Sequence, residues 1–184
     1  MSIVILPTGP PAATAVVPGQ TVASDLWDNG PAALDWWMRN PPHAVLAQTV
    51  AQSIVSGVGT SVSFDTAIRD NFFGGYVPAG QVGGGYTAQV PGTYLVQGVT
   101  NLAWGGAAGK TAGAYLSVSA SSIAAAVEIP AAPAVSRIQH SISALIRMRV
   151  NDFVQLQIFQ NSGAAQPTGF TATGCRMSVR WIAL

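Results

Sequence analysis

Residues 90–104, VPGTYLVQGVTNLAW, begin with a turn and continue without a charged side chain to the end of the stretch. Pro91 and Gly92 suit a tight corner, because proline fixes its own φ and glycine accepts backbone angles that other residues avoid. The run from Thr93 to Trp104 is rich in β-branched, aromatic and other apolar side chains, as strands are. We predict that this run is an interior strand of an antiparallel β-sandwich.

The composition is that of a chain that folds and then associates. Of the 184 residues, 49% are hydrophobic and only 8% are charged, against roughly 25% charged in an average soluble protein. So many apolar residues offset the entropy lost on folding, and the length suits one domain with a short extension. The exposed surface must then be mostly uncharged, so we expect other subunits to cover part of it.

Charge and hydropathy argue against two kinds of partner. Eight Lys and Arg against seven Asp and Glu leave a net charge of +1, which gives no reason to expect nucleic acid. Two pairs of arginines have the period-two spacing of a strand's outer face: Arg147 with Arg149, and Arg176 with Arg180. The apolar run from residue 3 stops at Pro7, too short for a signal peptide or a membrane span, so we expect no membrane insertion.

We predict two regions, an attachment region at 1–44 and a β domain at 45–184. Up to residue 23 the chain is rich in Pro, Ala, Thr and Val with no helical or strand period, which predicts an extended arm. The following SDLWDNGPAALDWWMRNPP predicts a short helical segment, because Ser24 or Asp28 can cap its start and the final two prolines end it.

Three of the five tryptophans, Trp27, Trp36 and Trp37, lie in this short helical segment. A segment so small cannot enclose them by itself. Either they pack against the neighbouring β domain, or they dock into a partner, since buried Trp is a frequent anchor of protein interfaces. Together with Pro41 and Pro42, they are the predicted attachment residues.

From Val45 onward, strand patterns alternate with turn residues. Eight stretches have strand character: residues 45–55, 60–66, 85–90, 92–104, 113–121, 136–150, 152–162 and 175–184. About eight antiparallel strands separated by Gly, Pro and Ala loops indicate a two-sheet sandwich. The expected fold class is therefore all-β, with an N-terminal extended arm and a short helical segment in front.

The stretch 136–150 alternates most regularly. One face carries apolar side chains and one histidine: Ile138, His140, Ile142, Ala144, Ile146, Met148 and Val150. Such alternation places this face in the core. Asn151 and Asp152 tolerate positive φ in a tight turn, so we predict a hairpin between this strand and residues 152–162.

YTAQVPGTYLVQGV at 86–99 resembles the Y-x-x-x-x-P-G-x-Y signature of the C1q/TNF-like jelly roll. VNDFVQLQIFQNSG at 150–163 resembles a later G-D-x-V stretch of the same domains, with Asn151 at the usual glycine, and MSVRWIAL at 177–184 resembles their final strand. The resemblance implies a two-sheet antiparallel jelly-roll sandwich that forms a homotrimer, packed around a three-fold axis through one sheet of each protomer. Gly98 either lets a second protomer approach closely or clears a bulky neighbour inside the monomer.

DWWMRNPPHAVLAQTVAQSIVSGVGTSVSFDT at 35–66 is similar to the N-terminal region of tail-associated proteins of phages that infect actinobacteria. That likeness implies a virion protein made in the bacterial cytoplasm: a minor tail or fibre-like component displayed for host attachment, with other virion proteins as partners. The alternative is a capsid decoration protein bound to capsomers through its arm. The loop after Phe64 is shorter than in the family, so no ligand of that loop is carried over.

No catalytic residue, metal site or cofactor is predicted. His43 and His140 are the only histidines, and neither has a His or carboxylate at ligand spacing. Asp65 and Asp70 lie in a loop setting that favours turn chemistry over the paired acids of a sugar hydrolase. We expect His140 to be a hydrogen-bonded core or interface residue. Cys175, the single cysteine, excludes an internal disulfide and is expected to pack in the core.

Four aromatic residues lie beside glycines in one loop region: Phe72, Phe73, Tyr76 and Tyr86. Aromatic faces can stack on sugar rings, so we predict these residues as the surface-ligand loop, with a glycan of the host cell envelope as ligand. The alternative is that the rings seal the edge of the sandwich.

Overall fold

The structure is a computed structural model that describes residues 39–71, 75–78, 84–105, 110–119, 122–130, 137–169 and 174–183. Its strands are β1 (His43–Ala47), β2 (Ser53–Ile54), β3 (Thr60–Ser61), β4 (Thr66–Asp70), β5 (Tyr76–Val77), β6 (Gly85–Thr87), β7 (Gly92–Ala103), β8 (Thr111–Val118), β9 (Ser122–Pro130), β10 (Arg137–Met148), β11 (Phe153–Gln160), β12 (Gln166–Pro167) and β13 (Arg176–Ala183). By its internal contacts the chain divides into two compact units, Met1–Pro41 and Pro42–Leu184. In the described part of the chain, no helix has the length and hydropathy that a membrane crossing needs.

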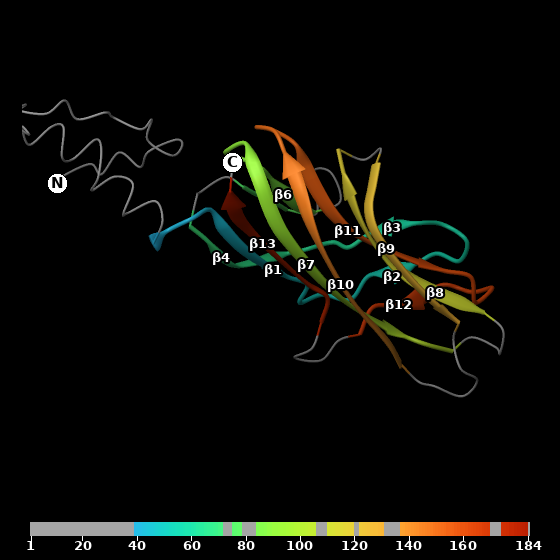
Figure 1. The fold of residues 1–184 in the computed structure, drawn as a ribbon. Helices are drawn as coiled ribbons and strands as arrows, with labels where there is room; N and C mark the ends of the chain where they lie inside the picture. Colours follow the sequence, from blue (N-terminus) through green and yellow to red (C-terminus); the bar gives the residue numbers. More distant parts are fainter. Residues whose placement is uncertain are drawn as a thin grey trace, which may run out of the picture. The chain divides into compact units, whose positions relative to one another are not determined.

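Two antiparallel sheets form the sandwich (Figure 1). The five-stranded sheet has the order β10-β7-β13-β1-β4, and the six-stranded sheet has the order β5-β6-β11-β8-β9 with β3 also paired to β11. β7 therefore lies between β10 and β13, which confirms the predicted interior strand. The predicted all-β two-sheet sandwich is confirmed as well.

The corner before β7 is held by two aromatic side chains. Tyr94 donates its hydroxyl to the carbonyl of Val90 at 2.6 Å, and Trp181 donates Nε1–H to the carbonyl of Pro91 at 3.2 Å. Gly92 has φ +148°, and a Cβ there would lie 2.4 Å from the carbonyl oxygen of Ala183. The turn thus needs glycine for two reasons: the backbone angle is one that other residues avoid, and β13 leaves no room for a Cβ.

The core lies between the two sheets and is built from alternate residues of each strand. β7 contributes Tyr94 and Val96, and the facing β11 contributes Leu156, all fully buried. Gly98 is on the same face, where a Cβ would lie 2.7 Å from Leu156 Cδ1 and 3.1 Å from Ile142 Cγ2. Gly98 therefore clears bulky neighbours inside the monomer, which is one of its two predicted roles, and its role as a contact point for a second protomer stays a prediction.

β10 has the predicted faces but not the predicted partner. Its buried side chains alternate with exposed ones, as expected for a strand with one face in the core. The prediction is wrong for Val150, which is 50% exposed in the turn after β10. It pairs with β7, however, while β11 belongs to the other sheet, so the predicted hairpin is wrong. The link does turn sharply at Asn151, which has φ 70°. The link carries the chain from one sheet to the other. The hairpin prediction failed because alternation specifies which face of a strand is buried but not which strand is its partner.

Cys175, the residue before β13, is fully buried, as predicted. The backbone N–H of Asn101 points at its sulfur, 3.4 Å away. Burial raises the pKa of the thiol to about 11, so Cys175 stays protonated and serves as a small core residue.

Candidate functional site

The predicted attachment residues are divided between two parts of the chain. Trp27, Trp36 and Trp37 lie outside the described residues. Pro42 is buried, and its carbonyl accepts the N–H of Trp181 at 2.8 Å. Pro42 thus continues the ladder between β1 and β13 by one hydrogen bond, while Pro41 is half-buried just before it.

The predicted surface-ligand loop is divided in the same way. Phe72 and Phe73 lie outside the described residues. Tyr86 is fully buried, with its ring 6.2 Å from that of Tyr94, so the prediction of an exposed ring is wrong for this residue. It lies on the inward-facing side of β6, and its place in the alternation makes it a core residue. Tyr76 is half-buried and donates its hydroxyl to the carbonyl of Phe64 at 3.1 Å.

No group of three or more His, Cys, Asp or Glu side chains that could hold a metal ion occurs among the described residues. Asp65 instead caps a loop: its carboxylate accepts the backbone N–H groups of Thr49 and Val50 at 2.8–3.0 Å and the hydroxyl of Thr66 at 2.9 Å. Burial opposes ionisation, but the hydrogen bonds outweigh it and lower the pKa of Asp65. This is the turn chemistry that the sequence predicts.

His140 lies in the core and is 2% exposed. Its Nδ1 is 3.3 Å from the hydroxyl of Thr100 on the neighbouring strand β7. Burial lowers the pKa of the imidazole, with the backbone of Ala112 acting in the opposite direction. His140 is therefore a neutral core residue, one of the two roles predicted for it.

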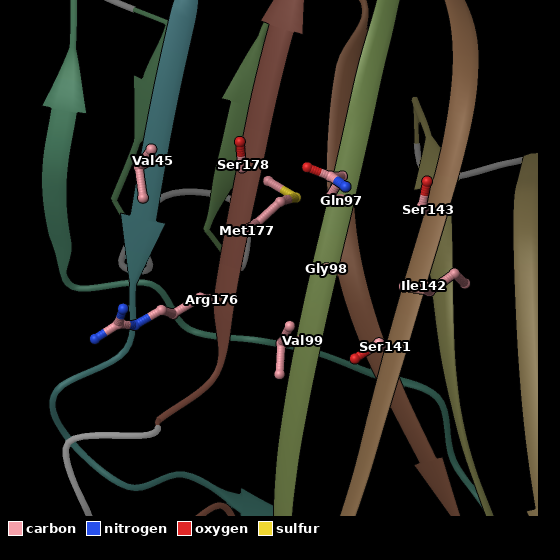
Figure 2. Close-up of a pocket in the computed structure, with 10 residues that line it drawn as sticks. All are labelled: Val45, Gln97, Gly98, Val99, Ser141, Ile142, Ser143, Arg176, Met177 and Ser178. Carbon is pink, nitrogen blue, oxygen red and sulfur yellow. The ribbon is translucent and has the colours of Figure 1, made fainter.

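The outer face of the five-stranded sheet holds a hollow of about 420 Å³ (Figure 2). Strands β1, β13, β7 and β10 line it with Val45, Gln97, Gly98, Val99, Ser141, Ile142, Ser143, Arg176, Met177 and Ser178. The register explains the shape, because Ser143, Gln97 and Ser178 lie side by side on adjacent strands. Short hydroxyl side chains in the middle of the face leave the hollow between larger neighbours.

The same face gathers most of the chain's positive charge. Five of its eight Lys and Arg are exposed there: Arg69, Arg137, Arg147, Arg176 and Arg180. Among the described residues, no Asp or Glu shares this face. The predicted outward placement of strand arginines is confirmed at 147, 176 and 180, whereas Arg149 lies in the turn after β10.

One corner of the face concentrates this charge on three neighbouring strands. His43 of β1 is opposite Arg180 of β13, and two residues along β1, Val45 is opposite Arg69 of β4. Burial lowers the pKa of His43, and the positive charges of Arg69 and Arg180 lower it further. We name His43, Arg69 and Arg180 the basic corner.

Three solved structures show which known fold this sandwich has. The globular domain of zebrafish complement 1qA matches with TM-score 0.53 and 15% identity, over 77% of this chain and 97% of that one. Murine APRIL matches with TM-score 0.57 and 11% identity, over 78% of this chain and 100% of that one. Eiger TNF from S. frugiperda matches with TM-score 0.52 and 9% identity, over 78% and 94% of the two chains. The fold is a C1q/TNF-like jelly roll.

No family model matches the sequence, and no curated protein matches it either. At these identities the structural likeness establishes the jelly roll alone. The basic corner of this jelly roll was missed by sequence reasoning, which paired only arginines close in sequence. Arg69 and Arg180 are brought together by β1, which separates β4 from β13, and that neighbourhood follows from the topology.

Proposed function

We propose that this chain is a non-enzymatic structural protein of a phage virion, a homotrimeric tail-associated component that displays its jelly roll for attachment to the host surface. Two observations support the proposal, the jelly-roll fold and the small number of charged residues. The virion assignment rests on the resemblance of residues 35–66, given in the sequence analysis, to tail-associated proteins of actinobacterial phages. The observation that carries the self-association is the outer face of the five-stranded sheet.

That face has the features of a subunit interface. Leu145 is 69% exposed near the end of β10, opposite Leu95 on β7. Beside this apolar pair, the hollow is lined by short, mostly uncharged side chains. A second copy can bury the two leucines and fill the hollow if the exposed arginines of this face, such as Arg180 opposite Leu95, lie at the rim of the interface, where their charges stay in water.

The arm and tryptophan-rich segment serve as the attachment region in this proposal. Trp27, Trp36 and Trp37 bind another virion protein, and the jelly roll projects outward from the particle. Replacing Trp36 and Trp37 with Ala should abolish incorporation into particles while the purified protein keeps its Tm. If that variant melts at a lower temperature but still enters particles, the tryptophans belong to the fold of the free protein and the attachment role is wrong.

Quantitative mass spectrometry of purified particles tests the location. A handful of copies at one end, seen by labelling and negative-stain imaging, is the expected result for a tail component. Hundreds of copies would establish the alternative, a capsid decoration protein bound to capsomers through its arm. A protein that sediments as a monomer and never co-purifies with particles would overturn both.

A glycan of the host envelope is the proposed ligand of the displayed jelly roll. Phe72, Phe73 and Tyr76 are the residues proposed to contact it, with Tyr86 removed because it is buried. Glycan-array binding by the purified protein is the test. Silence on the array, together with normal adsorption by a Phe72→Ala/Phe73→Ala variant, would remove the ligand from the proposal.

A further inference from the structure

The basic corner brings together side chains from three adjacent strands. β4, β1 and β13 lie side by side in the five-stranded sheet (Figure 1). His43 is directly opposite Arg180 on β13, and Arg69 on β4 is opposite Val45, two residues further along β1. The exposed Arg69 and Arg180 therefore flank β1 on the outer face of the sheet, with the half-buried His43 close to both.

The acidic residues of the unit Pro42–Leu184 make their contacts away from this corner. Asp70 follows Arg69 in the chain, but its carboxylate accepts the N–H of Tyr76 at 3.0 Å. The other three are engaged or distant: Asp65 caps its own loop, Asp152 accepts the N–H of Arg149 at 2.7 Å, and Glu128 lies on β9 in the other sheet. Within the described part of the chain, the side chains of Arg69 and Arg180 make no hydrogen bond or ion pair.

Positive charges this close to one another are unfavourable for the fold. Directly opposite residues of antiparallel strands have Cβ atoms about 5 Å apart, and like charges there destabilise a sheet. The fold avoids part of this cost by keeping His43 neutral, because burial and the charges of Arg69 and Arg180 lower its pKa. An anion held between the two arginines would compensate both charges, so its binding is favourable.

We propose that the basic corner is a binding site for a phosphate group, with Arg69 and Arg180 as its charged donors and His43 as a further hydrogen-bond donor. A guanidinium group presents paired N–H donors that fit the oxygens of a phosphate. The backbones of β4 and β13 are two strand spacings apart, about 10 Å, and the long arginine side chains can close over β1 on a tetrahedral group. A carboxylate, with two oxygens in one plane, is less suited to donors from three strands.

The first test measures binding to the full-length protein by isothermal titration calorimetry at constant ionic strength. The probes are inorganic phosphate and poly(glycerol phosphate), and sodium acetate is the carboxylate for comparison. Both phosphate probes should bind the wild type, and acetate should bind it more weakly. Arg69→Gln/Arg180→Gln should weaken phosphate binding at least about tenfold, because two charge-assisted hydrogen bonds are lost.

The matched control is Arg147→Gln/Arg149→Gln, which removes two exposed arginines outside the corner. This variant should bind both phosphate probes as the wild type does. Tighter binding of the polymer than of inorganic phosphate, lost in the corner variant, would identify a phosphodiester polymer as the ligand. Equal affinity per phosphate group would identify a small phosphate instead.

The second test uses the two histidines to locate the bound phosphate. In NMR titrations of protein labelled with ¹³C-histidine, poly(glycerol phosphate) should raise the pKa of His43, because the polymer compensates the charges of Arg69 and Arg180. His140 is buried in the core and serves as the internal control, whose pKa should not change. In Arg69→Gln/Arg180→Gln, the pKa of His43 should already be raised and should no longer respond to the polymer.

Three results would overturn the phosphate site. They are equal binding of acetate and phosphate, equal affinity of the two arginine variants, and a pKa of His43 that does not respond to the polymer. The site lies within the unit Pro42–Leu184 and does not rest on the proposed trimer. Its failure would therefore leave the proposed virion protein standing, and a monomeric wild-type protein could still bind phosphate.

Discussion

Gly98 shows how little room the core leaves at the centre of β7. A Cβ there would lie 2.7 Å from Leu156 Cδ1, closer than side-chain carbons pack. Overpacking a closed core typically costs about 1–3 kcal/mol. We predict that Gly98→Ala lowers the free energy of unfolding by this amount in urea titrations, and that Leu156→Val in the same chain recovers part of it.

The control for this prediction is Gly59→Ala. A Cβ at Gly59 would meet Gln157 Oε1 at 3.6 Å, an ordinary contact, and its φ is not in the left-handed region. The substitution should leave the stability unchanged within about 0.5 kcal/mol. If the two substitutions lower the free energy of unfolding equally, then close packing around Gly98 is not the cause of the loss.

His140 and His43 predict how stability depends on pH. The pKa of each is lowered in the fold, by burial first and for His43 also by its two arginines. Below the unfolded-state pKa of about 6.5, the unfolded chain takes up protons that the folded chain refuses, so stability falls as the pH drops. His140→Gln and His43→Gln should each make urea midpoints at pH 5.5 and pH 7.5 differ less than in the wild type. If both variants show the same difference between the two urea midpoints as the wild type, the lowered histidine pKa values do not control the pH dependence of stability.

The turn between β10 and β11 allows a test of the left-handed backbone conformation of Asn151. Asn151 has φ 70°, a left-handed geometry that Gly and Asn accept and that costs other residues about 1–2 kcal/mol. Asn151→Gly should therefore fold with unchanged stability, while Asn151→Ala should lose about 1 kcal/mol of unfolding free energy in the same urea assay. Two equally stable variants would mean that the turn relaxes to another conformation.

The strands show which parts of the fold can be predicted from the sequence alone. In β10 the alternation predicts the buried face correctly, since each inward position must be apolar or hydrogen-bonded. The partner of β10 was predicted wrongly, because a short turn between two strands suggests a hairpin even where the chain changes sheet. The same limit hid the basic corner: Arg69 and Arg180 are more than a hundred residues apart, and only the order of strands in the sheet unites them.

At the scale of the whole molecule, the proposed trimer interface can be tested at Leu145. This side chain is 69% exposed on the outer face of the five-stranded sheet, where a neighbouring subunit would cover it. Leu145→Arg should convert the trimer to monomers in sedimentation-velocity runs, because this face already carries exposed arginines, so that the interface would have to bury three more unpaired positive charges. The matched control is Val58→Arg, at a position that is 55% exposed in the loop between β2 and β3. Dissociation by both variants, or by neither, would place the interface elsewhere.

The central position of β13 in the five-stranded sheet has a kinetic consequence. β1 and β7 are both hydrogen-bonded to β13, so neither is fully paired until a strand far along the chain has joined them. Contacts this distant in sequence slow folding into the range of milliseconds to seconds. During that interval the edges of β1 and β7 stay open, and open strand edges on identical nascent chains can pair with one another. The yield of correctly folded protein should therefore depend on how quickly β13 pairs with β1 and β7.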